Sequence, residues 1–368
     1  MEFQGNYVAD AKNVFLASAV SGQNAVFVGP PGWGKTHMAQ IAARAIAAIE
    51  GVIFLEFDPS TPPEVVKGSY NPAALLDGRL ERVFTDTPYD PRGKIVICDE
   101  LFRTSDIVFD AFLHVTESKT RPPLSMPVFW ATANHVAEYE RVEALRDRFA
   151  FWFYLIVDKP DIKEIVKGHL SNGSDSPHWS SEFPKWEECL DIRRIIPGKA
   201  QVAMIADFIN TLAREAYNCD FDINPRRLVQ WSEILFRYSA FLNGKAEFSA
   251  IPKKAMAILA YAYPNVNLEK ATTWKRAVTA LVDKEGAALV EVVENLRVRL
   301  EQIVNAKRTE SRENFNQEIG QFISMAQKSL EQFSSDSRAS DLIEKLMGWY
   351  AQMTLGINSG LDWLKVEL

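Results

Sequence analysis

One short segment, Gly29–Thr36, constrains the fold of this chain more than any other feature. It reads Gly-Pro-Pro-Gly-Trp-Gly-Lys-Thr, which fits the pattern G-x-x-x-x-G-K-T. The apolar run Ala25–Val28 precedes it, and the alanine-rich stretch Thr36–Ile49 follows with the composition of a helix. Strand, glycine-rich loop and helix in this order form the context in which the pattern binds phosphate. The sequence therefore predicts an α/β fold with a phosphate-binding loop after one strand.

The residue types in this loop predict which groups face a nucleotide. Glycines let the backbone curl so that successive N–H groups point at phosphate oxygens, and the helix N-terminus adds a partial positive charge. Lys35 is expected to neutralise the β- and γ-phosphates of ATP, and Thr36 to place its hydroxyl on Mg²⁺. The expected ATP contacts are the loop and the residue after it: Gly29, Pro30, Pro31, Gly32, Trp33, Gly34, Lys35, Thr36 and His37.

Further apolar runs predict the other strands of a parallel sheet. They alternate with helical stretches, which is typical of a sheet covered on both faces. After Pro160 the helical period dominates and no convincing strand follows, while residues 171–186 have the composition of a linker. The predicted strands are 25–28, 53–57, 94–98, 128–131 and 151–157, and the predicted helices are 7–20, 36–49, 106–117, 138–146, 199–217, 226–242 and 251–262.

Two of the predicted strands end in polar side chains, at the edge where open α/β sheets bind ligands. Lys94–Cys98 leads into Asp99 and Glu100, so we expect Asp99 to hold Mg²⁺ and Glu100 to polarise the attacking water. The run that starts at Val128 leads into Asn134, which is placed to orient that water or to sense the γ-phosphate. An acidic strand end or a turn asparagine is common in isolation, but the loop upstream favours the functional interpretation.

Two arginines, Arg146 and Arg148, close a short predicted helix before the last strand. Arginine near a helix C-terminus can simply complement the helix dipole. The sharper hypothesis is an arginine finger that reaches the catalytic site of a neighbouring subunit, for which Arg148 is favoured and Arg146 is second.

Composition excludes several classes of protein. The 368 residues predict two or three domains, and a net charge of -7 disfavours a protein that coats nucleic acid by bulk charge, although it leaves room for a local basic channel. The 3 cysteines support neither a disulfide framework nor a zinc site. The N-terminus is a poor signal peptide and no apolar run reaches the ~18 residues that span a bilayer. We therefore expect a cytoplasmic protein.

The order of these motifs resembles that of AAA+ ATPases, and among them the MoxR family. Gly29–Thr36 is similar to Walker A, Ile95–Glu100 to Walker B and Ala131–Asn134 to sensor 1, while Leu145–Phe149 falls where the family has its arginine finger. The run Asp99–Arg103 is similar to the family's D-E-hydrophobic-x-R sequence. The resemblance therefore implies an ATPase that depends on Mg²⁺.

Three further segments enter this resemblance. Pro62–Gly68 resembles the family segment before Walker B, where such proteins carry an inserted hairpin, and Arg79–Thr85 is the expected arm of it. Asn224–Leu228 is similar to the family's sensor 2, which makes Arg226 the implied γ-phosphate contact within its own subunit. Cys98 and Trp33 depart from the family pattern, and Cys98 on a buried strand is expected to be a small core residue.

The resemblance covers roughly residues 1–263. It implies an AAA+ α/β core over 1–158 and an α-helical lid over 159–265, and it leaves 266–368 as a C-terminal helical accessory domain. It also implies a homo-oligomeric ring, a hexamer, that remodels a protein client or a von Willebrand factor A-type partner on a separate chain. The alternatives are a nucleic-acid motor such as a McrB-like translocase, which the acidic charge disfavours, and an assembly scaffold with slow turnover.

Overall fold

The computed structural model describes the chain as two compact units, Met1–Val278 and Thr279–Leu368, which are treated separately below. The described residues are 6–116, 127–135, 139–155, 182–244, 247–263, 268–283, 292, 295–296, 298–299, 303, 312–333, 339–340, 342–344 and 346–347. The predicted linker lies outside them except for its last residues.

The first unit contains a five-stranded parallel sheet in the order β2-β5-β6-β1-β7. All five predicted apolar runs form these strands, and the inner strands lack alternation because helices bury both of their faces. β1 lies between β6 and β7, so the loop that follows it leaves the middle of the sheet. The strands are β1 (Asn24–Val28), β2 (Val52–Glu56), β5 (Ile95–Asp99), β6 (Val128–Ala133) and β7 (Phe149–Tyr154).

Aromatic side chains attach helices to opposite faces of this sheet. Phe15 of α1 packs against Trp130, whereas Phe112 of α5 packs edge-on against Phe129. Phe129 and Trp130 are consecutive in β6 and therefore point to opposite faces. The result is the layered AAA+ fold that the sequence predicts. The short and long helices of this part are α1 (Asn6–Ser21), α2 (Lys35–Ala47), η1 (Ile49–Gly51), α3 (Glu64–Lys67), η2 (Leu101–Arg103), α5 (Asp106–Val115) and α6 (Tyr139–Arg146).

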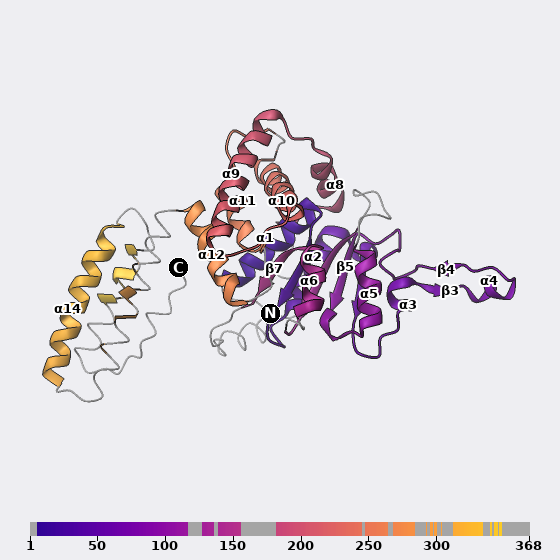
Figure 1. Cartoon of the computed structure of the whole chain (residues 1–368), viewed down its shortest axis with the longest axis horizontal. Helices are drawn as coiled ribbons and strands as arrows, with labels where there is room; N and C mark the ends of the chain where they lie inside the picture. The colour runs from indigo at the N-terminus through magenta and orange to yellow at the C-terminus, as the bar shows by residue number, and fades with distance from the viewer. Residues whose placement is uncertain are drawn as a thin grey trace. The chain divides into compact units, whose positions relative to one another are not determined.

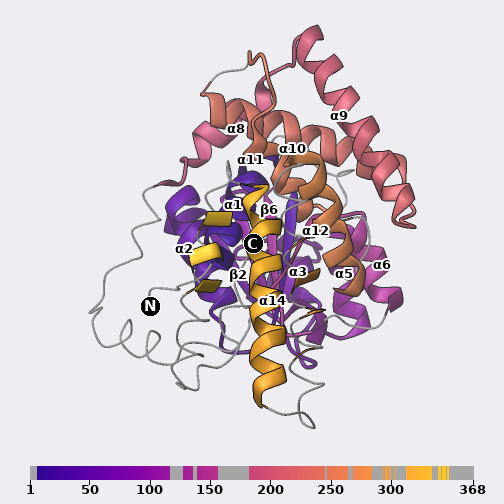
Figure 2. The same cartoon turned by 90° about the vertical axis from the view of Figure 1, so that its left-hand side faces the viewer.

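In the described part of the chain, only helices follow β7, and those of the first unit gather at one end of the sheet (Figures 1 and 2). Within this helical lid, Trp274 of α12 stacks on Trp231 of α10 at 5.1 Å between ring centroids. This contact explains why the first unit extends to Val278, beyond the expected end of the lid at residue 265. The lid helices are α8 (Trp186–Arg194), which the sequence did not predict, α9 (Lys199–Asn218), α10 (Pro225–Asn243), α11 (Lys253–Ala257), η6 (Ile258–Ala260) and α12 (Leu268–Val282).

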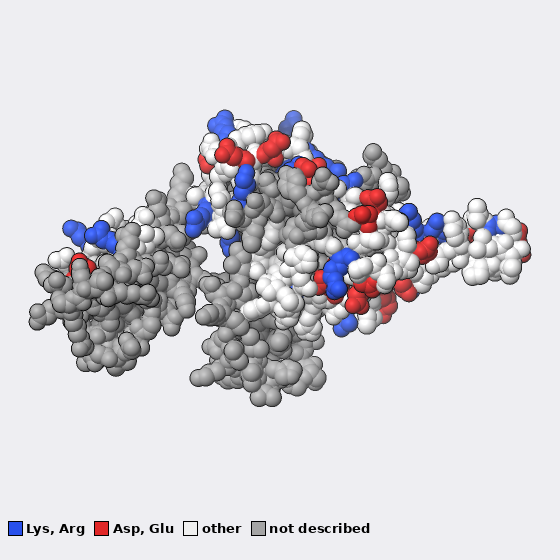
Figure 3. Space-filling view, turned by 60° about the horizontal axis from the view of Figure 1, so that its bottom comes forward, with Lys and Arg blue, Asp and Glu red and all other residues white. Residues whose placement is uncertain are grey.

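An arm (residues 69–83) projects from the sheet core between β2 and β5 (Figure 1). It consists of β3 (Ser69–Tyr70) and β4 (Arg82–Val83) in antiparallel pairing, with α4 (Pro72–Leu76) between them. Asn71 caps α4 and Pro72 occupies its first turn, a sequence signal for a helix start. The outer end of the arm is largely uncharged (Figure 3). This structure contains the inserted hairpin that the resemblance implied for Arg79–Thr85.

The second unit has a small apolar core of its own around α14 (Arg312–Glu331). Ile319, Phe322, Ala326 and Leu330 are buried on one face of that helix, with the spacing of an amphipathic helix. They pack with Leu296, Leu342 and Leu346. Among the helices that the structure describes in either unit, none has the length and apolar character needed to cross a bilayer.

Candidate nucleotide site at the carboxyl edge of the sheet

The phosphate loop starts at Gly29, which is tightly enclosed. Its N–H donates to the carbonyl of Ala133 at 3.1 Å, and the N–H of Leu155 donates to the carbonyl of Val28 at 2.7 Å. A Cβ atom on Gly29 would lie 2.5 Å from the Cβ of Leu155, so no other residue fits here. The first loop residue is therefore fixed between the ends of β6 and β7.

The rest of the loop is open to a ligand. Gly32 and Gly34 have φ angles of 81° and 73°, which glycine adopts without strain, and a Cβ on Gly32 would meet no atom within 4 Å. α2 begins at Lys35 without a side-chain cap, so its first N–H groups face the loop. Pro30 and Pro31 are exposed, Trp33 is half-buried and His37 is exposed. This is a cradle of backbone donors suited to phosphate oxygens.

Lys35 lies at the centre of the site and is 6% exposed. Its ammonium donates to the carbonyl oxygens of Gly29 and Pro30 at 2.8 Å and to Oδ1 of Asn134 at 2.9 Å. Burial lowers the pKa of Lys35, while the nearby carboxylates of Glu100 and Asp99 oppose that shift. A buried cation at a helix N-terminus, beside an open glycine loop, has the chemistry that binds a phosphate chain.

Two hydroxyls and one carboxylate meet beside the lysine. Thr36 donates from Oγ1 to Oδ1 of Asp99 at 2.6 Å, and the hydroxyl of Thr132 donates to the same oxygen. Hydroxyl and carboxylate oxygens are ligands that Mg²⁺ prefers, so Thr36 and Asp99 fit the predicted metal site. Thr132 is not among the site residues predicted above, although a hydroxyl inside an otherwise apolar strand is a sequence signal for it.

Glu100 follows β5 in a left-handed conformation, with φ 56° and ψ 37°. Such a conformation costs a non-glycine residue about 1–3 kcal/mol and is frequent at functional sites. The N–H of Glu100 donates to the hydroxyl of Thr132 at 3.4 Å, and its Oε1 accepts a bond from Nδ2 of Asn134. Asn134 thus connects the loop lysine with the predicted catalytic carboxylate. We call Lys35, Thr36, Asp99, Glu100, Thr132 and Asn134 the carboxyl-edge cluster.

The two candidate finger arginines lie at the turn between α6 and β7. Arg148 donates from its guanidinium to the carbonyl of Ala144. Arg146 forms ion pairs with Glu143 and Asp147, both at 3.8 Å, and its side chain is 19% exposed. Both side chains therefore lie against the C-terminal end of α6 in this structure.

The lid places two adjacent arginines very differently. Arg226, the predicted γ-phosphate contact, is exposed in the first turn of α10. Arg227 is 3% exposed and donates to the backbone carbonyls of Arg146, Phe149 and Ala150. Arg227 is not among the predicted site residues, although its spacing to Trp231 and Ile234 places it on the apolar face of α10.

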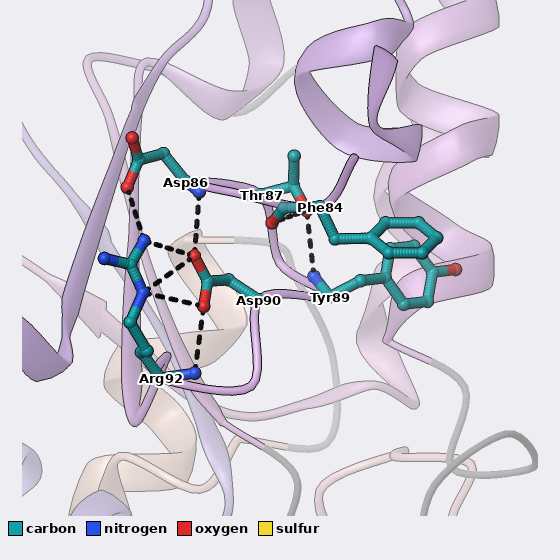
Figure 4. Close-up of polar contacts among 6 residues, drawn as sticks. All are labelled: Phe84, Asp86, Thr87, Tyr89, Asp90 and Arg92. Atoms are coloured by element: carbon teal, nitrogen blue, oxygen red, sulfur yellow. Dashed lines mark hydrogen bonds and ion pairs between the residues drawn. The ribbon is translucent and has the colours of Figure 1, made fainter. Parts of the chain in front are cut away.

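A second polar cluster lies in the segment between the arm and β5, residues 84–92, which we call the Asp90 loop. Figure 4 shows the polar contacts within it. The Asp90 carboxylate is 3% exposed and accepts bonds from the N–H of Asp86, the N–H of Arg92 and the guanidinium of Arg92. Hydrogen bonds from Arg92 hold the pKa of Asp90 well below its usual range.

Cys98, in the following strand, is fully buried and burial raises its pKa, as expected for a core residue.

A family model and several solved structures are similar to this chain. Residues 24–149 match the family model described as AAA domain (dynein-related subfamily). A crystal structure of a "putative ATPase" from Cytophaga hutchinsonii aligns with 16% identity and a TM-score of 0.48, over 73% of this chain and 88% of that one. A full-length MCM homolog from Methanopyrus kandleri aligns with 12% identity and a TM-score of 0.39, over 75% of this chain and 55% of that one. The region matched by the AAA-domain model contains the whole carboxyl-edge cluster.

Proposed function

We propose that this protein binds Mg-ATP at the carboxyl-edge cluster and hydrolyses it to ADP and phosphate. The observation that carries this proposal is the hydrogen-bonded connection from Lys35 through Asn134 to Glu100, beside the Thr36–Asp99 pair. One end of this connection fits a phosphate group, and the other end fits a general base. Few functions other than nucleotide hydrolysis require both within one hydrogen-bonded group.

Residues of the carboxyl-edge cluster have different proposed roles. Lys35 and the N–H groups of the loop bind the phosphates, and Thr36 and Asp99 hold the metal. Mg²⁺, when bound, neutralises the charge that develops on the β- and γ-phosphate oxygens. Glu100 accepts a proton from the water whose oxygen attacks the γ-phosphorus, as the bond to the leaving oxygen of ADP breaks.

Asn134 is proposed to couple the binding of the γ-phosphate to the position of Glu100. Its Oδ1 accepts from Lys35 and its Nδ2 donates to Glu100 in the same conformation. A γ-phosphate that bonds with Lys35 competes with Oδ1 of Asn134 for that ammonium. When the phosphate binds, the amide of Asn134 therefore loses its bond to Lys35 and reorients, and Glu100 reorients with it.

We further propose that the site is completed by a second copy of the chain. Arg148, or else Arg146, is the proposed contact from the neighbouring subunit, and Arg226 is the proposed contact from the lid of the same subunit. Trp33 and His37 are proposed to border the nucleotide. A ring assembled in this way, hexameric and of the MoxR type, would use hydrolysis to remodel or mature a protein partner, and the net charge of -7 favours a protein over nucleic acid as that partner.

Glu100→Gln tests the proposed chemistry directly. The variant keeps the size and hydrogen-bonding capacity of the side chain but lacks a base, so we expect nucleotide affinity within a few-fold of the wild type and turnover lower by about 100-fold or more. Glu56→Gln is the matched control, because Glu56 ends β2 directly beside Asp99 of β5 and is exposed. Normal turnover in the Glu100→Gln protein would show that Glu100 is not the base.

The class of partner is tested by purifying Glu100→Gln protein in the presence of ATP, with Lys35→Ala protein as the parallel sample. We expect a protein that is retained by the first variant and absent from the second. Retained nucleic acid, together with ATPase activity that DNA stimulates in a salt-dependent manner, would instead support a nucleic-acid motor.

A further inference from the structure

The lid makes an unusually dense set of contacts with the turn that carries both candidate fingers, residues 146–149, called here the finger turn. Each backbone carbonyl from Arg146 to Ala150 accepts a bond from a side chain. Arg227 supplies the donors for Arg146, Phe149 and Ala150, the last at 3.0 Å. Its planar guanidinium carries five N–H donors in a fixed geometry, which suits it to hold several carbonyls at once.

Neighbours of Arg227 on α10 hold the remaining parts of the finger turn. Asn224 caps the helix by accepting from the N–H of Arg227 at 2.9 Å, and it donates from Nδ2 to Oδ1 of Asp147 at 2.7 Å. Gln230 donates to the carbonyl of Asp147 at 2.9 Å. From the sheet, Asn24 donates to the carbonyl of Arg148 at 2.9 Å. The path of the finger turn is thus set mainly by the first turns of α10.

Two other buried or half-buried lid arginines provide an internal comparison. Arg193 donates to the carbonyl of Ala19 at the end of α1, and Arg237 donates to the carbonyls of Ile192 and Ile195 at the end of α8. Both satisfy the free carbonyls of a helix end, a purely structural role. Arg227 also does this for α6, but it additionally holds the backbone on the other side of the finger turn.

We propose that Arg227 is a positioning residue: from the lid, it fixes the finger turn so that its arginine reaches the ATP site of the neighbouring subunit. This inference rests on the proposed function. It predicts that a subunit with a damaged Arg227 keeps a competent site of its own but presents a misplaced finger to the next subunit. Through Arg227, the lid of one subunit would therefore influence ATP hydrolysis in the neighbouring subunit.

The test mixes two defective proteins, Arg227→Gln and Glu100→Gln. Arg227→Gln alone should lose about 10-fold to 100-fold in turnover, because small misplacements of a catalytic group have effects of this size, while its nucleotide affinity stays within a few-fold. In a one-to-one mixture, about a quarter of the interfaces join an intact Glu100 site to an intact finger turn, since the interfaces are heterologous. The mixture should therefore hydrolyse ATP well above the mean of its two components.

Three matched variants make this outcome specific. Arg193→Gln removes a comparable buried guanidinium away from the finger turn, so its turnover per folded chain should equal that of the wild type. Arg226→Gln damages a contact within its own subunit and should gain nothing from the Glu100→Gln protein. Arg227→Lys retains a charge and a donor, and its turnover should lie between those of the wild type and Arg227→Gln.

Asn224→Asp provides a second route if Arg227→Gln fails to fold. Aspartate keeps the helix cap but removes the donor to Asp147 and adds a like charge beside it, so the finger turn shifts while Arg227 remains. It should also be rescued by the Glu100→Gln protein. Wild-type turnover in the Arg227→Gln variant, or a loss that mixing does not restore, would overturn the inference. An inactive wild-type protein would instead overturn the proposed function.

Discussion

The carboxyl-edge cluster and the Asp90 loop both contain a buried charged residue near β5, Lys35 in the first and Asp90 in the second, yet they are built differently. In the carboxyl-edge cluster, side chains bond mainly with other side chains, as in the contacts of Asn134 with Lys35 and Glu100. In the Asp90 loop, the carboxylate accepts from backbone N–H groups and from an arginine two residues away. Side chains can exchange such partners for a ligand, whereas bonds to the local backbone fix the course of the chain. The first cluster is therefore suited to chemistry and the second to stability.

Lys35→Ala should produce the largest effect of this comparison. Without the ammonium, both the loop carbonyls and the phosphates lose their shared partner, so we expect nucleotide affinity and turnover to fall by about 100-fold or more. Thermal unfolding should change little, because the loop stays fixed at Gly29. Titration with a fluorescent ATP analogue measures the affinity.

The control for this change is Lys94→Ala, directly before β5. Lys94 pairs with Glu187 at the surface, at 3.1 Å, and a surface pair contributes about 0–1 kcal/mol. Nucleotide binding by the Lys35→Ala protein as tight as that of the Lys94→Ala protein would contradict the assignment of the loop.

Asn134→Ala should have a smaller and more selective effect. The variant breaks the connection between Lys35 and Glu100 but leaves both charges in place, so turnover should fall by about 10-fold to 100-fold with affinity within a few-fold. His135→Ala, at the exposed next position, is the control. Equal losses in affinity and turnover would mean that Asn134 only supports the loop.

Asp90→Asn should affect stability and not activity. We expect the free energy of unfolding to fall by about 1–2 kcal/mol, with unchanged turnover per folded chain. The sign of its pH dependence follows from the lowered pKa of Asp90. The folded protein keeps this carboxylate ionised where the unfolded chain takes up a proton, so its stabilising effect is complete above about pH 4 and is lost as the pH falls through the folded pKa.

Urea unfolding of both proteins from neutral pH down to acid measures this effect. The difference in free energy of unfolding between the wild type and Asp90→Asn should become smaller as the pH falls below the usual pKa range of aspartate. A constant gap, or a large loss of turnover in Asp90→Asn, would remove the distinction between the two clusters.

Much of the carboxyl-edge cluster could be predicted from sequence because it is built from local signals. Each contributing strand is a continuous apolar run. Asp99 and Asn134 lie where two of these runs end, and Lys35 follows the loop after a third, so parallel strands bring the three residues to one edge. The hydrogen bonds among them depend on side-chain conformations that no spacing specifies. The left-handed conformation of Glu100 is likewise absent from any pattern, since glycine is the residue that signals it.

Contacts between segments that are distant in the sequence could not be predicted. The motif predicts a role for Arg226, but the buried neighbour Arg227 contacts the backbone of a segment far away in sequence. Backbone carbonyls have no residue identity, so no motif marks them as partners. The extension of the first unit to Val278 has a similar origin, because it depends on the stacking of Trp274 on Trp231.

The most direct test of the whole account is the ATPase activity per chain as a function of protein concentration. If a neighbouring subunit completes the carboxyl-edge cluster, activity per chain should rise steeply with concentration and level off when assembly is complete. It should follow the assembled fraction measured by light scattering on the same samples, and the Glu100→Gln protein should assemble without activity. Full activity per chain in dilute, monomeric protein would contradict the account, because it would show that each chain contains a complete site.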